Sequence, residues 1–389
     1  MTKVSTSEAL QSSGTKRFFF WIVTVLGVPV LLLVCAEAGL RLADYGSRTA
    51  FFIPIEGQLA YATNPNFARQ FFPPALARLP LPIRVAFDKP DDVTRIVVLG
   101  GSAAMGEPEP TFSFSRILDV MLSRQYPDRK FEVINTGMAT INSHVVRLIA
   151  EECSKIEPDI VLIYMGNNEV VGPFGAGTVF GSFSPSLTLI RLGIRLRSYR
   201  LGQLAEEILR WVGGTTQFVP EGQGMAMFRD QYVQSDDDRL QKVYMHFERN
   251  LTDIVETLRR DGAEVVVSTV GANLVDHSPF ASVFGHGLGK ADPQTWGMMF
   301  VNGITYAEEG NLVKAIRMLE GANRIDSTHA ELHYRMGHLY HDQGNQSAAR
   351  AHLIRARDFD ALRFRVDSKL NQIIRDTGDR LKVRSVDTA

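Results

Sequence analysis

Short runs of apolar residues, each closed by small or polar residues, recur through the middle of the chain and predict buried β-strands. The clearest run is residues 96–99, which leads into Gly100, Gly101 and Ser102. Between such runs, apolar residues recur at helical spacing and predict amphipathic helices, as in residues 247–259 and 366–375. Five strands are expected, at residues 96–99, 131–135, 159–165, 264–269 and 381–387. This alternation predicts an α/β fold with a flavodoxin-like, doubly wound parallel five-stranded sheet.

The longest apolar run of the chain lies near its amino terminus, at residues 18–36, and contains no charged residue. As a helix it would be about 28 Å long, enough to cross the hydrocarbon core of a membrane. Lys3, Lys16 and Arg17 precede it, which favours a cytoplasmic tail at 1–17, a single-pass anchor at 18–38 and an exported, periplasmic main body. A cleaved signal peptide is the alternative, because Ala36-Glu-Ala38 resembles a cleavage site.

Two further segments differ from the sheet pattern. Residues 39–92 are rich in proline and aromatic residues and predict an extended stem. Residues 172–235 form an insertion after the third strand, and part of it mixes leucines with arginines at helical spacing. We expect this insertion to be a helical cap over the active site; the alternative is that it lies on a membrane surface.

A period of 34 residues marks the region that follows the fourth strand, within residues 291–365. Two sets of residues recur at this spacing: Gly303, Tyr306, Gly310, Asn311, Ala315, Ala322 and Asp326, and then Gly337, Tyr340, Gly344, Asn345, Ala349, Ala356 and Asp360. The pattern resembles the tetratricopeptide repeat, a helix-turn-helix unit. Because two repeats rarely fold alone, we expect them to pack on the α/β domain and to offer a site for a protein partner.

Candidate chemistry gathers at the ends of the first three strands. The first strand leads to Ser102, the second to Gly137, and the third to the sequence Gly166-Asn-Asn-Glu169. Parallel strands bind ligands at their carboxyl ends. A serine there is a candidate nucleophile. The N–H groups of Ser102 and Gly137 and the amide of Asn168 are candidate donors to an oxyanion.

These three motifs, in this order, resemble those of the SGNH/GDSL hydrolases, a family of serine esterases and acyl-modifying enzymes. Gly100-Gly-Ser102 stands for the family's Gly-Asp-Ser, and Glu169 replaces a final aspartate. The resemblance covers a hydrolase domain at 93–290, with its last helix and strand at 366–389. It implies catalysis by Ser102, with Gly137 and Asn168 as the oxyanion hole, on an acyl ester such as acetylated polysaccharide.

The resemblance also implies a late Asp-x-x-His segment that supplies the base. Asp326-Ser-Thr-His329 has this spacing, but Asp326 has a repeat twin in Asp360, so we interpret it as a helix-boundary residue. The family's segment would begin beyond Ala389, and we therefore expect the chain to lack it, as a truncated or degenerate enzyme. The alternative bases are His144 and His277, with His286 in the same loop as His277.

Composition narrows the remaining classes. With 42 basic and 43 acidic residues the net charge is −1, which disfavours nucleic acid as a partner. No clustered Cys/His pattern predicts a metal, and Gly100 to Gly106 lacks a nucleotide-binding pattern, so no cofactor is expected. The sequence thus predicts a membrane-anchored serine esterase or acyl hydrolase. The alternative is a catalytically inert, membrane-anchored scaffold that binds partners through its repeats.

Overall fold

The computed structural model describes residues 18, 20–21, 23–213, 227–285 and 292–389. Its centre is a five-stranded parallel sheet with the strand order β5-β4-β6-β7-β8. The strands are β4 (Val93–Gly100), β5 (Lys130–Asn135), β6 (Ile160–Tyr164), β7 (Glu264–Ser268) and β8 (Arg384–Val386). The predicted doubly wound α/β sheet is therefore confirmed. The last strand is shorter than expected, because residue 381 still belongs to the preceding helix.

The central strand β4 explains why the sheet is so clearly written in the sequence. Val97 lies opposite Ile134 of β5 and Val161 of β6, and all three side chains are buried. Such a strand, paired on both edges and covered on both faces, is apolar almost throughout. Its one charged buried residue, Arg95, forms a 2.6 Å ion pair with Glu132.

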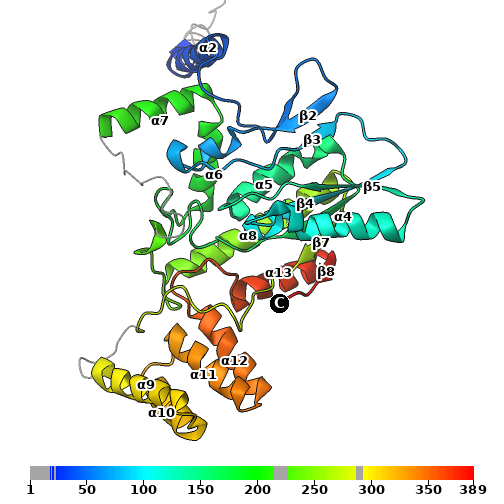
Figure 1. The fold of residues 1–389 in the computed structure, drawn as a ribbon. Coiled ribbons are helices and arrows are strands. Elements are labelled where there is room, and N and C mark those ends of the chain that lie inside the picture. The colour runs from blue at the N-terminus through cyan, green and yellow to red at the C-terminus, as the bar shows by residue number, and fades with distance from the viewer. Residues whose placement is uncertain (1–17, 19, 22, 214–226, 286–291) are drawn as a thin grey trace, which may run out of the picture. The chain divides into compact units, whose positions relative to one another are not determined.

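Helices connect the strands and cover the sheet (Figure 1). After β4 come the short helix α3 (Ser102–Met105) and α4 (Phe114–Gln125). The later connections contain α5 (Ser143–Glu152), α8 (Arg239–Arg260) and α13 (Ser368–Leu381). α5 packs on α8, and α8 on α13, whereas α4 packs on β5. Right-handed crossovers therefore place α4 on one face of the sheet and the other three helices on the opposite face.

The region 39–92 is more ordered than an extended stem. It contains an antiparallel sheet of β1 (Phe52–Pro54), β2 (Ala60–Thr63) and β3 (Arg84–Ala86). Two 3-10 turns, η2 (Phe67–Gln70) and η3 (Pro74–Leu76), follow β2. The aromatic residues that suggested a stem form the core of this part, with the rings of Phe51 and Phe67 packed edge to face at 5.0 Å.

The repeat region consists of two antiparallel helix pairs. They are α9 (Asp292–Glu308) with α10 (Leu312–Ile325), and α11 (Ala330–Asp342) with α12 (Gln346–Asp358). Each turn uses a glycine with positive φ followed by an asparagine cap: the Asn311 side chain accepts from the Lys314 N–H at 3.2 Å and that of Asn345 from the Ala348 N–H at 3.1 Å. The 34-residue period in the sequence thus corresponds to one helix pair.

The chain divides into two compact units. One comprises residues 50–187 and 219–389 and holds both sheets and the repeats. The other comprises residues 1–49 and 188–218, with the turn η1 (Val23–Gly27) and the helices α2 (Val28–Leu42), α6 (Leu187–Arg197) and α7 (Arg200–Gly213). The helical span Val23–Leu42 is long and apolar enough to cross a membrane, a property it shares with signal sequences. The helices α6 and α7 of the insertion therefore group with the candidate membrane helix.

Candidate active site

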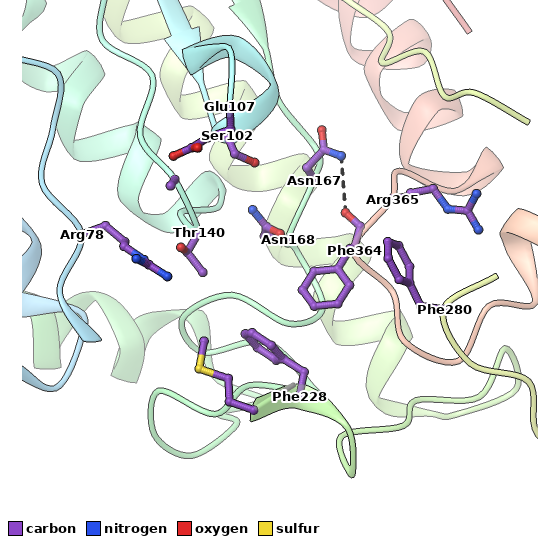
Figure 2. Close-up of a pocket in the computed structure, with 12 residues that line it drawn as sticks. Arg78, Ser102, Glu107, Thr140, Asn167, Asn168, Phe228, Phe280, Phe364 and Arg365 are labelled. Atoms are coloured by element: carbon purple, nitrogen blue, oxygen red, sulfur yellow. Dashed lines mark hydrogen bonds between the residues drawn. The ribbon is translucent and has the colours of Figure 1, made fainter. Parts of the chain in front are cut away.

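A pocket of about 450 Å³ opens at the carboxyl end of the sheet and brings together residues from distant parts of the chain (Figure 2). Ser102 and Asn168 both line it, as the sequence predicts for a nucleophile and an oxyanion donor. Its other lining side chains include Arg78, Glu107, Thr140, Phe228, Phe280, Phe364 and Arg365. The pocket therefore combines polar groups near the strand ends with an aromatic wall.

Ser102 is positioned by a tight connection between β4 and α3. A Cβ atom at Gly100 would lie 2.1 Å from the Tyr164 carbonyl oxygen and 2.6 Å from the Ala104 Cβ, so only glycine fits there. The chain turns at Gly101, and Ser102 becomes the first residue of α3, half-buried at the pocket. The N–H of a first helical residue has no acceptor within its own helix. It is thus a suitable donor for an anionic ligand beside the hydroxyl.

Asn168 approaches the same point from the end of β6. Its backbone adopts a left-handed conformation with φ 63°, and its side chain is buried. The Nδ2 atom lies 3.8 Å from the place a Cβ on Gly101 would occupy, next to Ser102. Its hydrogen bond to the Ile141 carbonyl is long, at 3.4 Å. The amide is therefore held near the serine without a strong competing acceptor.

Gly137 has a different environment from the one expected. Its N–H donates to the Asn135 side-chain oxygen at 2.9 Å, and a Cβ here would lie 2.5 Å from the Met105 nitrogen. The glycine thus lets the loop after β5 pack closely on α3, and it is not among the residues that line the pocket. The pocket is lined instead by Thr140, a non-glycine residue at φ 68°.

The N–H of Thr140 has no hydrogen-bond acceptor within the part of the chain that the structure describes. It is therefore an additional candidate donor at the pocket. Sequence reasoning missed it because attention went to the glycine, while nothing in the type of residue marks a threonine as left-handed.

Glu169 lies behind the pocket, where the family motif has aspartate. Its carboxylate is buried and accepts hydrogen bonds from the Ser143 N–H and Oγ, both at 2.7 Å. Burial raises the pKa of Glu169 to about 8, although the two bonds from Ser143 act in the opposite direction. This side chain fixes the loop after β6 to the start of α5.

The two alternative bases lie in contrasting places. His144 is buried on α5, and its Nδ1 accepts from the Asn250 amide at 3.1 Å; it does not line the pocket. His277 is exposed, donates from Nδ1 to the Ser278 carbonyl at 3.1 Å, and packs its ring at 4.8 Å on that of Phe280, a pocket residue. His286 lies outside the described residues.

Part of the pocket wall follows directly after the repeats. The Phe364 carbonyl accepts from the Asn168 N–H at 3.3 Å and from the Asn167 side chain at 3.4 Å (Figure 2). The Phe364 ring packs edge to face on Phe228 at 5.0 Å and on Phe280 at 5.3 Å. The residues that end the repeat region therefore also hold the candidate oxyanion asparagine in place.

Asp326 and Asp360, the repeat twins, have equivalent structural roles. The Asp360 carboxylate accepts from the N–H groups of Phe280 and Ala281 at 2.9 and 3.0 Å, and Asp326 accepts from that of Gly285 at 3.1 Å. Each aspartate thus ties the loop after β7 to a repeat boundary. Asp360 also forms a 3.0 Å ion pair with Arg365. His329 caps α11 and packs on Trp296 at 4.5 Å, away from Ser102's pocket lining.

Within the described ranges, no three His, Cys, Asp or Glu side chains are arranged to hold a metal ion. Cys35 and Cys153 are both free thiols, the first exposed and the second buried. Burial raises the pKa of Cys153 to about 12, so this thiol is unreactive in the folded chain.

Comparison with known proteins identifies the repeat region. The tetratricopeptide repeat family matches residues 306–373, which confirms the repeat predicted from the 34-residue period. No curated protein matches the chain significantly.

Solved structures with related arrangements carry acylhydrolase names. The lipase/acylhydrolase from Enterococcus faecalis is 10% identical with a TM-score of 0.28, over 75% of each chain. TesA is 10% identical with a TM-score of 0.24, over 46% of this chain. A putative acylhydrolase from Bacteroides fragilis NCTC 9343 is 12% identical with a TM-score of 0.23, over 47% of this chain and 52% of its own. The chain spans 61% of the length of TesA.

Proposed function

We propose that this chain is a serine esterase or acyl hydrolase of the SGNH/GDSL type, with Ser102 as its nucleophile. The observation that carries the proposal is the pocket itself, which joins Ser102 to Asn168 from the end of a different strand. A serine hydroxyl beside preorganised N–H donors is the arrangement that acyl transfer requires.

The reaction follows from this geometry. The Ser102 oxygen forms a bond to the ester carbonyl carbon and passes its proton to a base, while the carbonyl oxygen becomes an oxyanion. The Ser102 N–H and the Asn168 amide stabilise that charge, with the Thr140 N–H as a third donor in preference to the engaged Gly137 N–H. Collapse breaks the bond to the alcohol, which takes the proton, and water then hydrolyses the acyl-serine.

For the base, the surroundings favour His277 over His144. His277 contacts the pocket wall through Phe280, whereas the Nδ1 of His144 is engaged by Asn250 inside the domain. The substrate would be an acyl ester whose apolar part lies against Phe228 and Phe364, with acetylated polysaccharide as one example. Lys3, Lys16 and Arg17 support an exported position for this site, outside the cytoplasmic membrane.

Hydrolysis of p-nitrophenyl acetate by the full chain in detergent tests the proposal. Ser102→Ala should abolish the activity and the covalent labelling by a fluorophosphonate probe, and Asn168→Ala should lower the rate by about 10²–10³-fold. Ser154→Ala, an exposed serine outside the pocket, is the matched control and should leave both unchanged. Equal activity in the Ser102→Ala variant would disprove the assignment.

A second function is favoured by one observation: no histidine lines the described pocket. In that case the chain would be an inert scaffold that binds partners through its tetratricopeptide repeats. A folded wild-type chain that neither hydrolyses the ester nor reacts with the fluorophosphonate would support the scaffold, because an unactivated serine does not attack such probes.

A further inference from the structure

Helix α7 begins beside the end of the candidate membrane helix. The Glu37 carboxylate accepts from the N–H groups of Arg200 and Leu201 at 3.1 and 2.9 Å, and from Arg41 at 2.8 Å. A carboxylate within an apolar span needs such partners, and the amino-terminal end of a helix is a favourable one. The start of α7 is therefore attached at the level of Glu37.

The polar side of α7 contacts the chain that follows the span. The Gln203 side chain accepts from the Ser47 N–H at 2.9 Å and donates to the Ser47 carbonyl at 3.1 Å. One turn further along, the Tyr45 hydroxyl donates to the Glu207 carboxylate. Since Tyr45 and Ser47 come after the end of the span at Leu42, this side of α7 is directed away from the apolar part of that span.

The opposite side of α7 is apolar and open. Ile208, Trp211 and Val212 lie on one face by their helical spacing, and 51%, 85% and 71% of their surfaces are exposed. Helix α6 shows a similar row on the side opposite the buried Ile190 and Ile194. This row consists of Leu189, Leu192 and Leu196, which are 62%, 51% and 54% exposed. Exposed apolar rows of this kind mark an interaction surface.

The charge of this helix pair is also distinctive. In a chain with net charge −1, residues 187–213 carry arginines at 191, 195, 197, 200 and 210 against glutamates at 206 and 207. Guanidinium groups bind phosphate in a two-point geometry. An apolar face bordered by arginines is the composition of helices that lie in the plane of a membrane interface.

We propose that α6 and α7 rest on the surface of the bilayer that α2 spans, with their exposed apolar rows among the lipids and their arginines at anionic phosphate headgroups. Depth supports this occupant. Glu37 lies five residues before the end of the span, or about 7.5 Å along the helix, and interfacial helices sink about 5–10 Å into the headgroup boundary. The pair would hold the chain close to the membrane that anchors it, on whichever side α2 emerges.

Nitroxide labels on the full chain, reconstituted in vesicles of phosphatidylcholine and phosphatidylglycerol, test the proposal. Labels are placed by Leu192→Cys and Trp211→Cys, with Arg210→Cys as the control on the polar side and Leu31→Cys within the span. The background carries Cys35→Ala, and Cys153 stays unlabelled because it is buried. Collision with oxygen, which concentrates in lipid, is compared with collision with a water-soluble nickel chelate.

The labels at 192 and 211 should show an oxygen-to-nickel ratio severalfold above that at 210 and approaching that at 31. This ratio should fall in vesicles without phosphatidylglycerol. A water-like ratio at 192 and 211, with a lipid-like ratio at 31, would overturn the proposal. Immobile labels excluded from both collision partners would show a protein partner instead of lipid and would overturn it too, as would a water-like ratio at 31.

Discussion

At the scale of single residues, the site depends on how closely the backbone segments approach. Gly100 and Gly101 are adjacent in the sequence but experience different surroundings. A Cβ at Gly100 would overlap the Tyr164 backbone, whereas one at Gly101 would meet its nearest atom at 3.4 Å. The first glycine is therefore needed for the fold, while the second leaves room beside Ser102 and Asn168.

This difference predicts contrasting effects for two alanine substitutions. Gly100→Ala should destabilise the chain by about 1–3 kcal/mol or more, because a rigid backbone cannot move aside as a side chain does. Gly101→Ala should fold with near wild-type stability but lose esterase activity, since its methyl group would lie 3.8 Å from the Asn168 amide. Thermal melting and p-nitrophenyl acetate hydrolysis measure the two effects. Equal melting temperatures for the two variants would contradict this account.

Glu169 gives a pH dependence of stability. Burial raises its folded pKa to about 8 from an ordinary value of 4.5, so between these pH values the folded chain keeps a proton that the unfolded chain has lost. The contribution of Glu169 to stability therefore falls as the pH rises from 4.5 to 8. The wild type should lose more stability than Glu169→Gln between pH 5 and pH 8 in thermal melts. Parallel losses in the two proteins would refute it, and exposed Glu157→Gln is the control.

The sequence predicts the part of the site that comes from strand ends. Ser102 and Asn168 follow apolar runs directly, and parallel strands bring such ends together. The rest depends on approaches that no local pattern records. The carbonyl of Phe364 reaches the Asn168 N–H from almost two hundred residues away, and the Gly137 N–H is taken by the side chain two residues before it.

At the scale of elements, the repeats are built by packing that the sequence shows openly. A Cβ at Gly303 would lie 2.5 Å from the Leu319 side chain, and one at Gly337 would lie 2.7 Å from that of Leu353. The same glycine–leucine contact thus closes both helix pairs, which is why these residues recur with one period. How the pairs attach to the α/β domain is not periodic, because it depends on loops such as the one that contacts Asp360.

That attachment predicts unequal roles for the two repeat aspartates. Asp360→Ala should cost about 3–5 kcal/mol of unfolding free energy, because it leaves the half-buried Arg365 charge and the loop N–H groups without their acceptor. Asp326→Ala removes hydrogen bonds to Gly285 and Thr328 and should cost about 1–3 kcal/mol. Urea denaturation in detergent compares the two. A larger loss for Asp326→Ala would contradict the central role given to Asp360.

At the scale of the whole molecule, the order of the chain does not follow the order of its compact units. Residues 188–218 come between two strands of the sheet, yet they group with the amino-terminal helix. The sequence predicts the amphipathic character of these residues, but their partner is decided by Glu37, a single carboxylate in an otherwise apolar run. Membrane attachment therefore involves two segments of the chain.

The orientation of that attachment is a prediction of the charges before the apolar run. Lys3, Lys16 and Arg17 favour the cytoplasmic side, which places the pocket outside the cytoplasm. In intact cells of a bacterial host, a membrane-impermeant maleimide should therefore label Glu56→Cys, an exposed residue after the span, and not Ser5→Cys before it. The background again carries Cys35→Ala, since the buried Cys153 does not react.

Replacing the three basic residues with glutamine should lower the labelling at position 56, because the positive charges are what hold the tail inside. Labelling at position 5 alone would reverse the orientation and place the pocket in the cytoplasm, where an exported polysaccharide ester is not a substrate. Release of the labelled chain from the membrane as a shorter product would identify the apolar run as a cleaved signal sequence. The orientation of one helix therefore determines which esters the Ser102 pocket can meet.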